Sequence, residues 1–236
     1  MEVFEPRSNA FSTMCGNGLR AVCRYWMDRG YPLRRGERFL IQTRSGVRAV
    51  KWDGGGRFAA EMGRLSTRAV DLARYVALRR LRFAGKRLER VRFPRAVEQR
   101  LPRSIDAAII GLSGDRKEGR MDGEPHLVFF FKRCGLPRLR GLARTLGRLL
   151  ATDRALFPRE INVSAACLGS ALSLCTYERG VYSVTRSCGT ASTVAAGFLL
   201  QRTGGRRMDV RTLGGRLVVE QRGRQLFLTG DARRRS

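Results

Sequence analysis

The chain reads Cys188-Gly189-Thr190-Ala191-Ser192-Thr193-Val194-Ala195-Ala196 in its second half and Cys15-Gly16-Asn17-Gly18-Leu19-Arg20-Ala21-Val22-Cys23 near its start. Both stretches begin with Cys-Gly, continue with a polar and a small residue, and run into a segment rich in Ala and Val with helical spacing. The two stretches therefore predict two helices that each begin directly after a cysteine.

A thiol at the start of a helix has distinctive chemistry. The backbone N–H groups there have no partner within the helix, and the helix dipole favours negative charge. Such a position lowers the pKa of a cysteine, so that its sulfur can act as a base or a nucleophile. Two such thiols indicate a matched pair. The alternative is that Cys15 and Cys188 are buried structural cysteines, because free cysteine is among the most buried residue types.

A matched pair could invert an amino-acid stereocentre if the two helix starts face each other across a cleft. The backbone N–H groups of Gly16, Asn17, Gly189 and Thr190 could then bind an α-carboxylate. One sulfur would lie on each side of the Cα atom, where a thiolate removes the α-proton and the opposite thiol delivers another. This chemistry needs two reduced sulfurs and neither pyridoxal phosphate (PLP) nor a metal, so we expect no cofactor.

The composition describes a folded and strongly basic protein. Its 236 residues are 43% hydrophobic, enough to bury a core, and its formal net charge is +27. Lys and Arg together number 47, almost all of them Arg, and they are scattered along the chain. Such a bias also arises from GC-rich coding. Since no basic arm or nucleic-acid motif is present, we expect nonspecific polyanion binding and no dedicated nucleic-acid partner.

The cysteine pattern and the apolar runs point to a cytoplasmic protein without a metal. The six cysteines lack Cys-x-x-Cys spacing and His126 is the single histidine, so a zinc site is not expected. No run approaches the roughly 18 apolar residues of a membrane span. The segment 1–5 does not resemble a secretory signal, and we expect reduced thiols in the cytoplasm.

The remaining sequence predicts strands, a helix and further strands in each half of the chain. Helices are predicted over 15–29, 67–81 and 136–150, and after Cys188 as far as Gly204. Strands are predicted over 39–52 (as a pair), 57–62, 105–112, 126–131, 161–163, 171–177, 208–210, 216–220 and 226–228. The strand 126–131 is almost entirely apolar, which predicts burial on both faces. The repeated order divides the chain near residue 120, into halves 1–120 and 121–236.

Several phrases, in a consistent order over most of the chain, resemble the signatures of the diaminopimelate epimerases. The stretch Met14–Arg20 resembles the first active-site signature of that family, and Tyr177-Glu178-Arg179-Gly180-Val181 followed by Cys188-Gly189-Thr190 resembles the second. Three shorter phrases are similar to further family motifs: Gly123-Glu124-Pro125-His126, Phe157-Pro158 followed by Ile161-Asn162-Val163, and Thr229-Gly230-Asp231-Ala232.

The resemblance implies an α+β fold of two pseudo-symmetric α/β domains. Each would be a curled, mainly antiparallel sheet around a central helix, with the site in the cleft between them. It also implies PLP-independent interconversion of LL- and meso-diaminopimelate, a small-molecule amino-acid substrate on the route to lysine and peptidoglycan. A homodimer is compatible with this family and is not specified by the sequence.

Position by position, the resemblance also implies site residues. The acid/base pair would be Cys15 and Cys188. The groups that hold the α-carboxylate would be Gly16, Asn17, Gly189 and Thr190. The residues that contact the amino groups or the distal carboxylate would be Glu124, Asn162, Glu178 and Arg179. His126 is expected to be either a catalytic helper or simply a polar residue at a strand start.

The chain departs from the family pattern at three places. The family has a longer segment before its first cysteine, so the first domain is expected to be truncated. Glu124 replaces the family Asn, and would either favour a cationic or hydrogen-bonding group of the substrate or pair with a nearby Arg. The loop between Glu178 and Cys188 is one residue longer, and Ala191 replaces Gly. Two alternatives therefore stay open: an epimerase of another amino acid, or an inactive truncated homologue with nonspecific polyanion binding.

Overall fold

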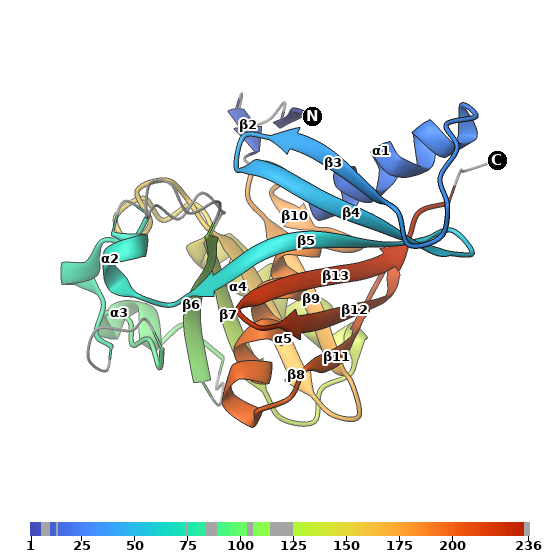
Figure 1. The fold of residues 1–236 in the computed structure, drawn as a ribbon. Helices are drawn as coiled ribbons and strands as arrows, with labels where there is room; N and C mark the ends of the chain where they lie inside the picture. Colours follow the sequence, from blue (N-terminus) through green and yellow to red (C-terminus); the bar gives the residue numbers. More distant parts are fainter. Residues whose placement is uncertain are drawn as a thin grey trace.

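A closed, mainly antiparallel barrel of eight strands forms the centre of the computed structural model (Figure 1). The structure describes residues 1–5, 10–12, 14–73, 75–83, 89–102, 106–113 and 125–233. Around the ring the order is β13-β12-β11-β9-β8-β7-β6-β5, and pairing of β13 with β5 closes it. The strands are β5 (Arg57–Ser66), β6 (Asp106–Ser113), β7 (His126–Phe131), β8 (Asn162–Leu168), β9 (Leu172–Glu178), β11 (Arg207–Thr212), β12 (Gly215–Arg222) and β13 (Gln225–Asp231). The β7–β8 and β9–β11 pairs are parallel.

Helix α5 (Gly189–Thr203) lies inside this barrel and contacts all eight of its strands. Small side chains make the fit possible, because a Cβ atom added at Gly197 would lie 2.6 Å from a methyl carbon of Leu226. The buried hydroxyls of Ser192 and Thr193 donate to the carbonyls of Cys188 and Gly189, 2.8 Å away in both cases. The Ala-rich stretch after Cys188 is thus the sequence of a helix that is enclosed on every side.

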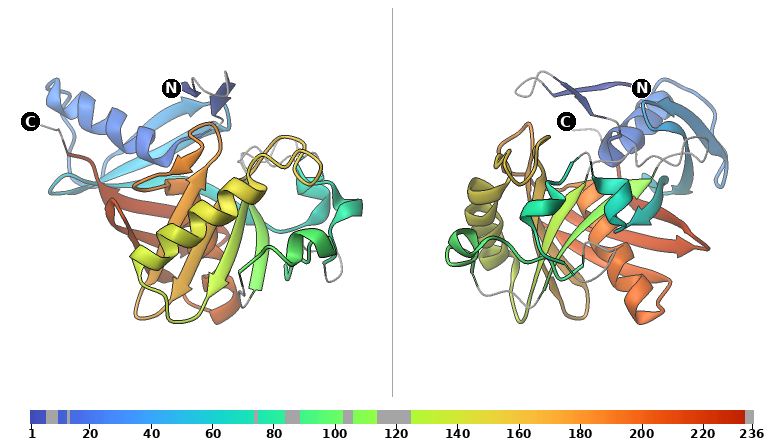
Figure 2. Two further views of the ribbon diagram at one scale, coloured as in Figure 1. Left: turned by 180° about the vertical axis from the view of Figure 1, so that it is seen from behind. Right: turned by 90° about the vertical axis from the view of Figure 1, so that its left-hand side faces the viewer.

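A second helix, α4 (Leu136–Leu150), lies across the outer face of β8 and β9 (Figure 2). Strand β7 is buried between the two helical layers. Its Val128 and Phe130 belong to the core around α5, whereas Leu127 and Phe129 belong to the core around α4. Because successive side chains of a strand point to opposite faces, an all-apolar β7 can supply both cores. The prediction of a strand buried on both faces is confirmed.

The first part of the chain extends the barrel sheet beyond β5. Strand β4 (Gly46–Gly54) pairs with β5, and β3 (Arg38–Thr43) pairs with β4 at the edge. Helix α1 (Gly16–Asp28) packs against β4, β5 and β13 (Figure 1). Short pairs complete the described sheet structure: β1 (Val3–Glu5) with β2 (Ala10–Ser12), and β10 (Ser183–Val184) with β9.

The expected α+β fold, with a curled sheet around a central helix, is confirmed. The predicted helix over 67–81 is wrong, because the described residues of that segment form only α2 (Ala69–Leu72) and a 3₁₀ turn, η1 (Leu78–Arg80). Its apolar side chains do not share a single helical face, so tertiary packing breaks the segment. A further short helix, α3, covers Arg95–Glu98. The division near residue 120 stays a prediction, and β5 and β6 lie in one barrel with the later strands.

Within the residues that the structure describes, none of the helices has both the length and the apolar character needed to cross a membrane.

Helix α4 offers a matched test of how it packs. A Cβ atom at Gly147 would lie 2.1 Å from Cγ of Tyr177, whereas a Cβ atom at Gly141 would meet nothing within 4 Å. We expect Gly147→Ala to lower the free energy of unfolding by about 1–3 kcal/mol through overpacking. Gly141→Ala should raise it by about 0.5–1 kcal/mol, since alanine is the better helix former. Urea unfolding of both variants checks this, and equal effects would contradict the packing described here.

Candidate active site

The N-termini of α1 and α5 meet at the rim of the barrel. A Cβ atom added at Gly189 would lie 3.4 Å from the Cα atom of Gly16, and 3.0 Å from a methyl carbon of Leu228. At Gly16 an added Cβ atom would lie 2.9 Å from the terminal methyl of Met62. Two helices can approach this closely only if their first residues lack side chains. The structure therefore brings together the two helix starts that the paired stretches predict.

Each of these helices has its cysteine as the N-cap residue, in extended backbone conformation. Cys15 has φ −132° and ψ 109°, and Cys188 has φ −110° and ψ 114°. The Gly18 N–H donates to Sγ of Cys15 at 3.3 Å, and Sγ of Cys188 lies 3.3 Å from Oγ1 of Thr190. Cys15 is partly exposed and Cys188 is buried. The Cys15 sulfur thus caps its helix, whereas the Cys188 sulfur contacts the Thr190 hydroxyl in the first turn of α5.

The net effect of this site on the thiols differs from the sequence-based expectation. Burial raises the pKa of Cys15, although the backbone N–H groups of Gly18 and Asn17 oppose the shift. Burial raises the pKa of Cys188 well above its usual value, and the Glu178 carboxylate and Cys15 add to that shift. The expected lowering is therefore wrong for the net pKa, because desolvation outweighs the helix N-terminus in a closed site.

The Asn17 side chain links the two cysteine loops. Its Nδ2 donates to the backbone carbonyl of Ser187 at 3.0 Å, directly before Cys188. Its Oδ1 accepts from Nη2 of Arg20 at 2.8 Å. The sequence predicts that the backbone N–H of Asn17 binds the α-carboxylate. It does not predict the contact of the Asn17 side chain with Ser187, because these residues are far apart in the chain.

Glu178 is the last residue of β9, and Arg179 follows it. The Arg179 N–H donates to Oδ1 of Asn162 at 2.8 Å, and the Thr185 hydroxyl donates to the Glu178 carboxylate. Burial is the largest cause of the raised pKa of both thiols, and the charge of the Glu178 carboxylate raises both further. The predicted residues Asn162, Glu178 and Arg179 therefore gather with the cysteines, and their roles remain predictions.

His126 begins β7 and is fully buried, opposite Asn162 in the parallel β7–β8 pair. Its Nε2 lies 3.1 Å from Oγ1 of Thr190, which itself contacts Cys188. Burial lowers the pKa of His126 to about 3, and the charge of Arg179 acts in the same direction. His126 is thus both a residue at a strand start and the neutral end of a chain of contacts that reaches Cys188. Glu124 lies outside the described residues.

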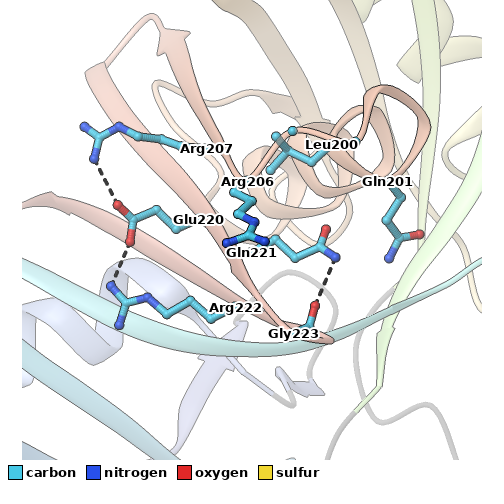
Figure 3. Close-up of a pocket in the computed structure, with 10 residues that line it drawn as sticks. Leu200, Gln201, Arg206, Arg207, Glu220, Gln221, Arg222 and Gly223 are labelled. Carbon is cyan, nitrogen blue, oxygen red and sulfur yellow. Dashed lines mark hydrogen bonds and ion pairs between the residues drawn. The ribbon is translucent and has the colours of Figure 1, made fainter.

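Two other kinds of candidate site can be compared with the cysteine site: a metal site and the cavity at the far end of α5. No group of three His, Cys, Asp or Glu side chains in the described part of the chain could hold a metal ion. A cavity of about 740 Å³ lies at the far end of α5, beside Gly204. Its lining includes charged side chains that pair with one another, as Figure 3 shows for Glu220, which accepts from Arg207 and Arg222. We therefore take the cysteine site as the candidate active site.

Similar solved structures identify the class of fold. A PhzF-family phenazine biosynthesis protein of Enterococcus faecalis has a TM-score of 0.61 at 12% identity, covering 94% of this chain and 71% of that one. A probable proline racemase of Agrobacterium radiobacter K84 has a TM-score of 0.57 at 13% identity, covering 94% and 66%. The chain thus has the fold of the PhzF and proline racemase-like proteins.

Curated relatives identify the family within that class. The diaminopimelate epimerase of Methanothrix thermoacetophila is 30% identical, over 98% of this chain and 71% of the relative. That of Archaeoglobus fulgidus is 28% identical, over 94% of this chain and 69% of the relative. No protein-family model matches the chain. The chain belongs to the diaminopimelate epimerase family.

His126 should make stability depend on pH. Its pKa is about 3 when folded and near 6.5 in the unfolded chain, so the unfolded state binds the extra proton as the pH falls below 6.5. The free energy of unfolding should fall by up to about 1.4 kcal/mol per pH unit between these values from this group. Urea unfolding at several pH values should show this slope in the wild type relative to His126→Gln. A difference between the two proteins that is constant with pH would contradict the assignment.

Glu178 should hold the thiols in the protonated form. Burial is the largest cause of the raised pKa of Cys15, and the Glu178 carboxylate adds to it. In Glu178→Gln we therefore expect iodoacetamide to alkylate Cys15 at lower pH than in the wild type, measured by peptide mass spectrometry. Glu220→Gln, at the far cavity, is the matched control and should leave the profile unchanged. An unchanged or upward shift in Glu178→Gln would show that the carboxylate does not act on the thiol.

Proposed function

We propose that this protein is a PLP-independent epimerase that interconverts LL- and meso-diaminopimelate through Cys15 and Cys188, for lysine and peptidoglycan precursor synthesis in the cytoplasm. The observation that carries the proposal is the contact between two cysteine-capped helix starts, at Gly16 and Gly189. Membership of the diaminopimelate epimerase family supports the substrate.

The two thiols divide the roles of base and acid. After burial and Glu178, the proximity of Cys15 also raises the pKa of Cys188, so a thiolate at one position keeps the other sulfur protonated. Cys15 is the base in this proposal, because two backbone N–H groups stabilise its charge and its burial is less complete. It removes the α-proton from one face, and Cys188 delivers a proton to the opposite face.

The helix N-termini stabilise the charge that develops on the α-carboxylate. Backbone N–H groups of Gly16, Asn17, Gly189 and Thr190 are the donors in this proposal, and they belong to the first turns of the two helices that meet. Their dipoles act in a site that burial has dried, where electrostatic stabilisation is stronger than in water. The same burial that raises the thiol pKa values therefore assists proton removal.

The polar residues that the family resemblance assigns to the site suit a substrate with a second amino-acid end. Glu178 and Glu124 would bind amino groups, and the Arg179 fork would bind a carboxylate together with Asn162. Glu124 also favours a second candidate, an epimerase of another amino acid, because the family has Asn at this turn. One structural neighbour, a hydroxyproline epimerase of Agrobacterium vitis with bound trans-4-hydroxy-L-proline, shows such a substrate on this fold at a TM-score of 0.53.

Isotope exchange tests the mechanism. Reduced protein incubated with LL-diaminopimelate in D₂O should place deuterium at the inverted α-carbon, followed by NMR and mass spectrometry. Cys15→Ala and Cys188→Ala should each lower kcat/KM for inversion by about a hundred- to ten-thousandfold, because one proton-transfer group is lost. Cys134→Ala, a partly exposed cysteine outside the site, is the control. Full inversion by either site variant would exclude the two-thiol mechanism.

A panel of L- and D-amino acids, including proline and hydroxyproline, separates the two candidate substrates. Inversion of diaminopimelate alone supports the first candidate. Faster inversion of another amino acid, reversed in favour of diaminopimelate by Glu124→Asn, supports the second.

A further inference from the structure

Arg20 is a charged side chain in an unusually closed place. It lies on α1, one turn after the cysteine cap, and only 4% of it is exposed. Its guanidinium packs on the backbone of β13, since a Cβ atom at Gly230 would lie 3.3 Å from Cζ of Arg20. Burying a charge is costly unless the charge is paired and hydrogen-bonded, so packing alone does not explain this position.

The contacts of Arg20 lead from one cysteine loop to the other. Its Nη2 donates to Oδ1 of Asn17 at 2.8 Å, and Nδ2 of Asn17 donates to the carbonyl of Ser187 at 3.0 Å. The guanidinium has only donors, so it forces the oxygen of the Asn17 amide toward itself. The amide nitrogen must then face Ser187, where an oxygen would meet another oxygen. Arg20 thereby determines which way the link between the loops is oriented.

The remaining guanidinium atoms make no compensating bond. Nε and Nη1 of Arg20 are buried without a hydrogen-bond partner among the described residues. Burial lowers the pKa of Arg20 to about 10, while Cys15 and Asp231 on β13 favour its charged form. A cation held at such a cost, beside the cap thiol of its own helix, is typical of a functional rather than a stabilising charge.

We propose that Arg20 is a positioning residue for the two-thiol reaction. It orients the Asn17 amide, which holds the Ser187 carbonyl, and so fixes the loop of Cys188 against the loop of Cys15. This inference rests on the proposed function for its kinetic consequence, but its effect on the Cys15 thiol can be measured without turnover.

The charges around Cys15 come from three elements. Arg20 on α1 favours the thiolate, whereas Glu178 at the end of β9 and a thiolate at Cys188, the N-cap of α5, oppose it. Compared with burial and the backbone N–H groups, Arg20 is a smaller influence on the pKa of Cys15. Its removal should therefore shift the titration of Cys15 upward, opposite in sign to the removal of Glu178.

The experiment uses Arg20→Met and Arg20→Lys, with Arg24→Met as the matched control one turn later on α1, where Arg24 pairs with Asp28. Alkylation of Cys15 by iodoacetamide is followed across pH. We expect the profile to move to higher pH in Arg20→Met, and to stay in place in Arg20→Lys and Arg24→Met. With diaminopimelate, kcat should fall about ten- to a hundredfold in Arg20→Met, as for a lost hydrogen bond to a charged group. Arg20→Lys should recover only part of this kcat, because an ammonium keeps the charge but lacks the planar fork of a guanidinium.

A double-mutant cycle with Asn17→Ala completes the test. If Arg20 acts through Asn17, the double variant should be no slower than the slower single variant. Additive losses, or identical alkylation profiles in Arg20→Met and Arg24→Met, would overturn the proposal. Should Arg20→Met fail to fold by circular dichroism, the cycle is run with Arg20→Lys, and full kcat in that variant overturns it. If the wild type turns over no diaminopimelate, the proposed function fails, while the alkylation profiles still decide the role of Arg20.

Discussion

The contact between Gly16 and Gly189 is the constraint on which the rest of this site depends. Helix α5 is enclosed, because it contacts every strand of the closed barrel. Helix α1 is held against β4, β5 and β13, which include the two strands that close that barrel. The two helix starts are therefore brought together by the sheet, and glycine at both first positions lets them touch.

Two opposing effects act on the thiols at this contact. A helix N-terminus stabilises a thiolate, while burial between two helices and a barrel rim destabilises it. Burial wins for both Cys15 and Cys188. In the proposed mechanism, a pair of thiols that holds at most one charge would provide one base and one acid.

Much of the fold was predictable because its signals are local. The helix over 136–150 agrees with α4 residue for residue, since its apolar side chains form one continuous face. The strand 126–131 agrees with β7 for a similar reason. The segment 67–81 was mispredicted because its apolar residues point in several directions, and contacts distant in sequence decide its path. Closure of the barrel through β13 and β5 had no local signal, since these strands are far apart in the chain.

By itself, the sequence determined the two cysteine caps, the order of the elements and the resemblance to the epimerases, because each of these is written in neighbouring residues. The tertiary structure decided that the two helix starts touch at Gly16 and Gly189, that Glu178 raises the pKa of both thiols and that Asn17 reaches Ser187. It also reversed the expected direction of the thiol pKa values. The physical reason is the same for all four. Each depends on contacts and burial between segments that are far apart in the chain, and these form only when the barrel closes.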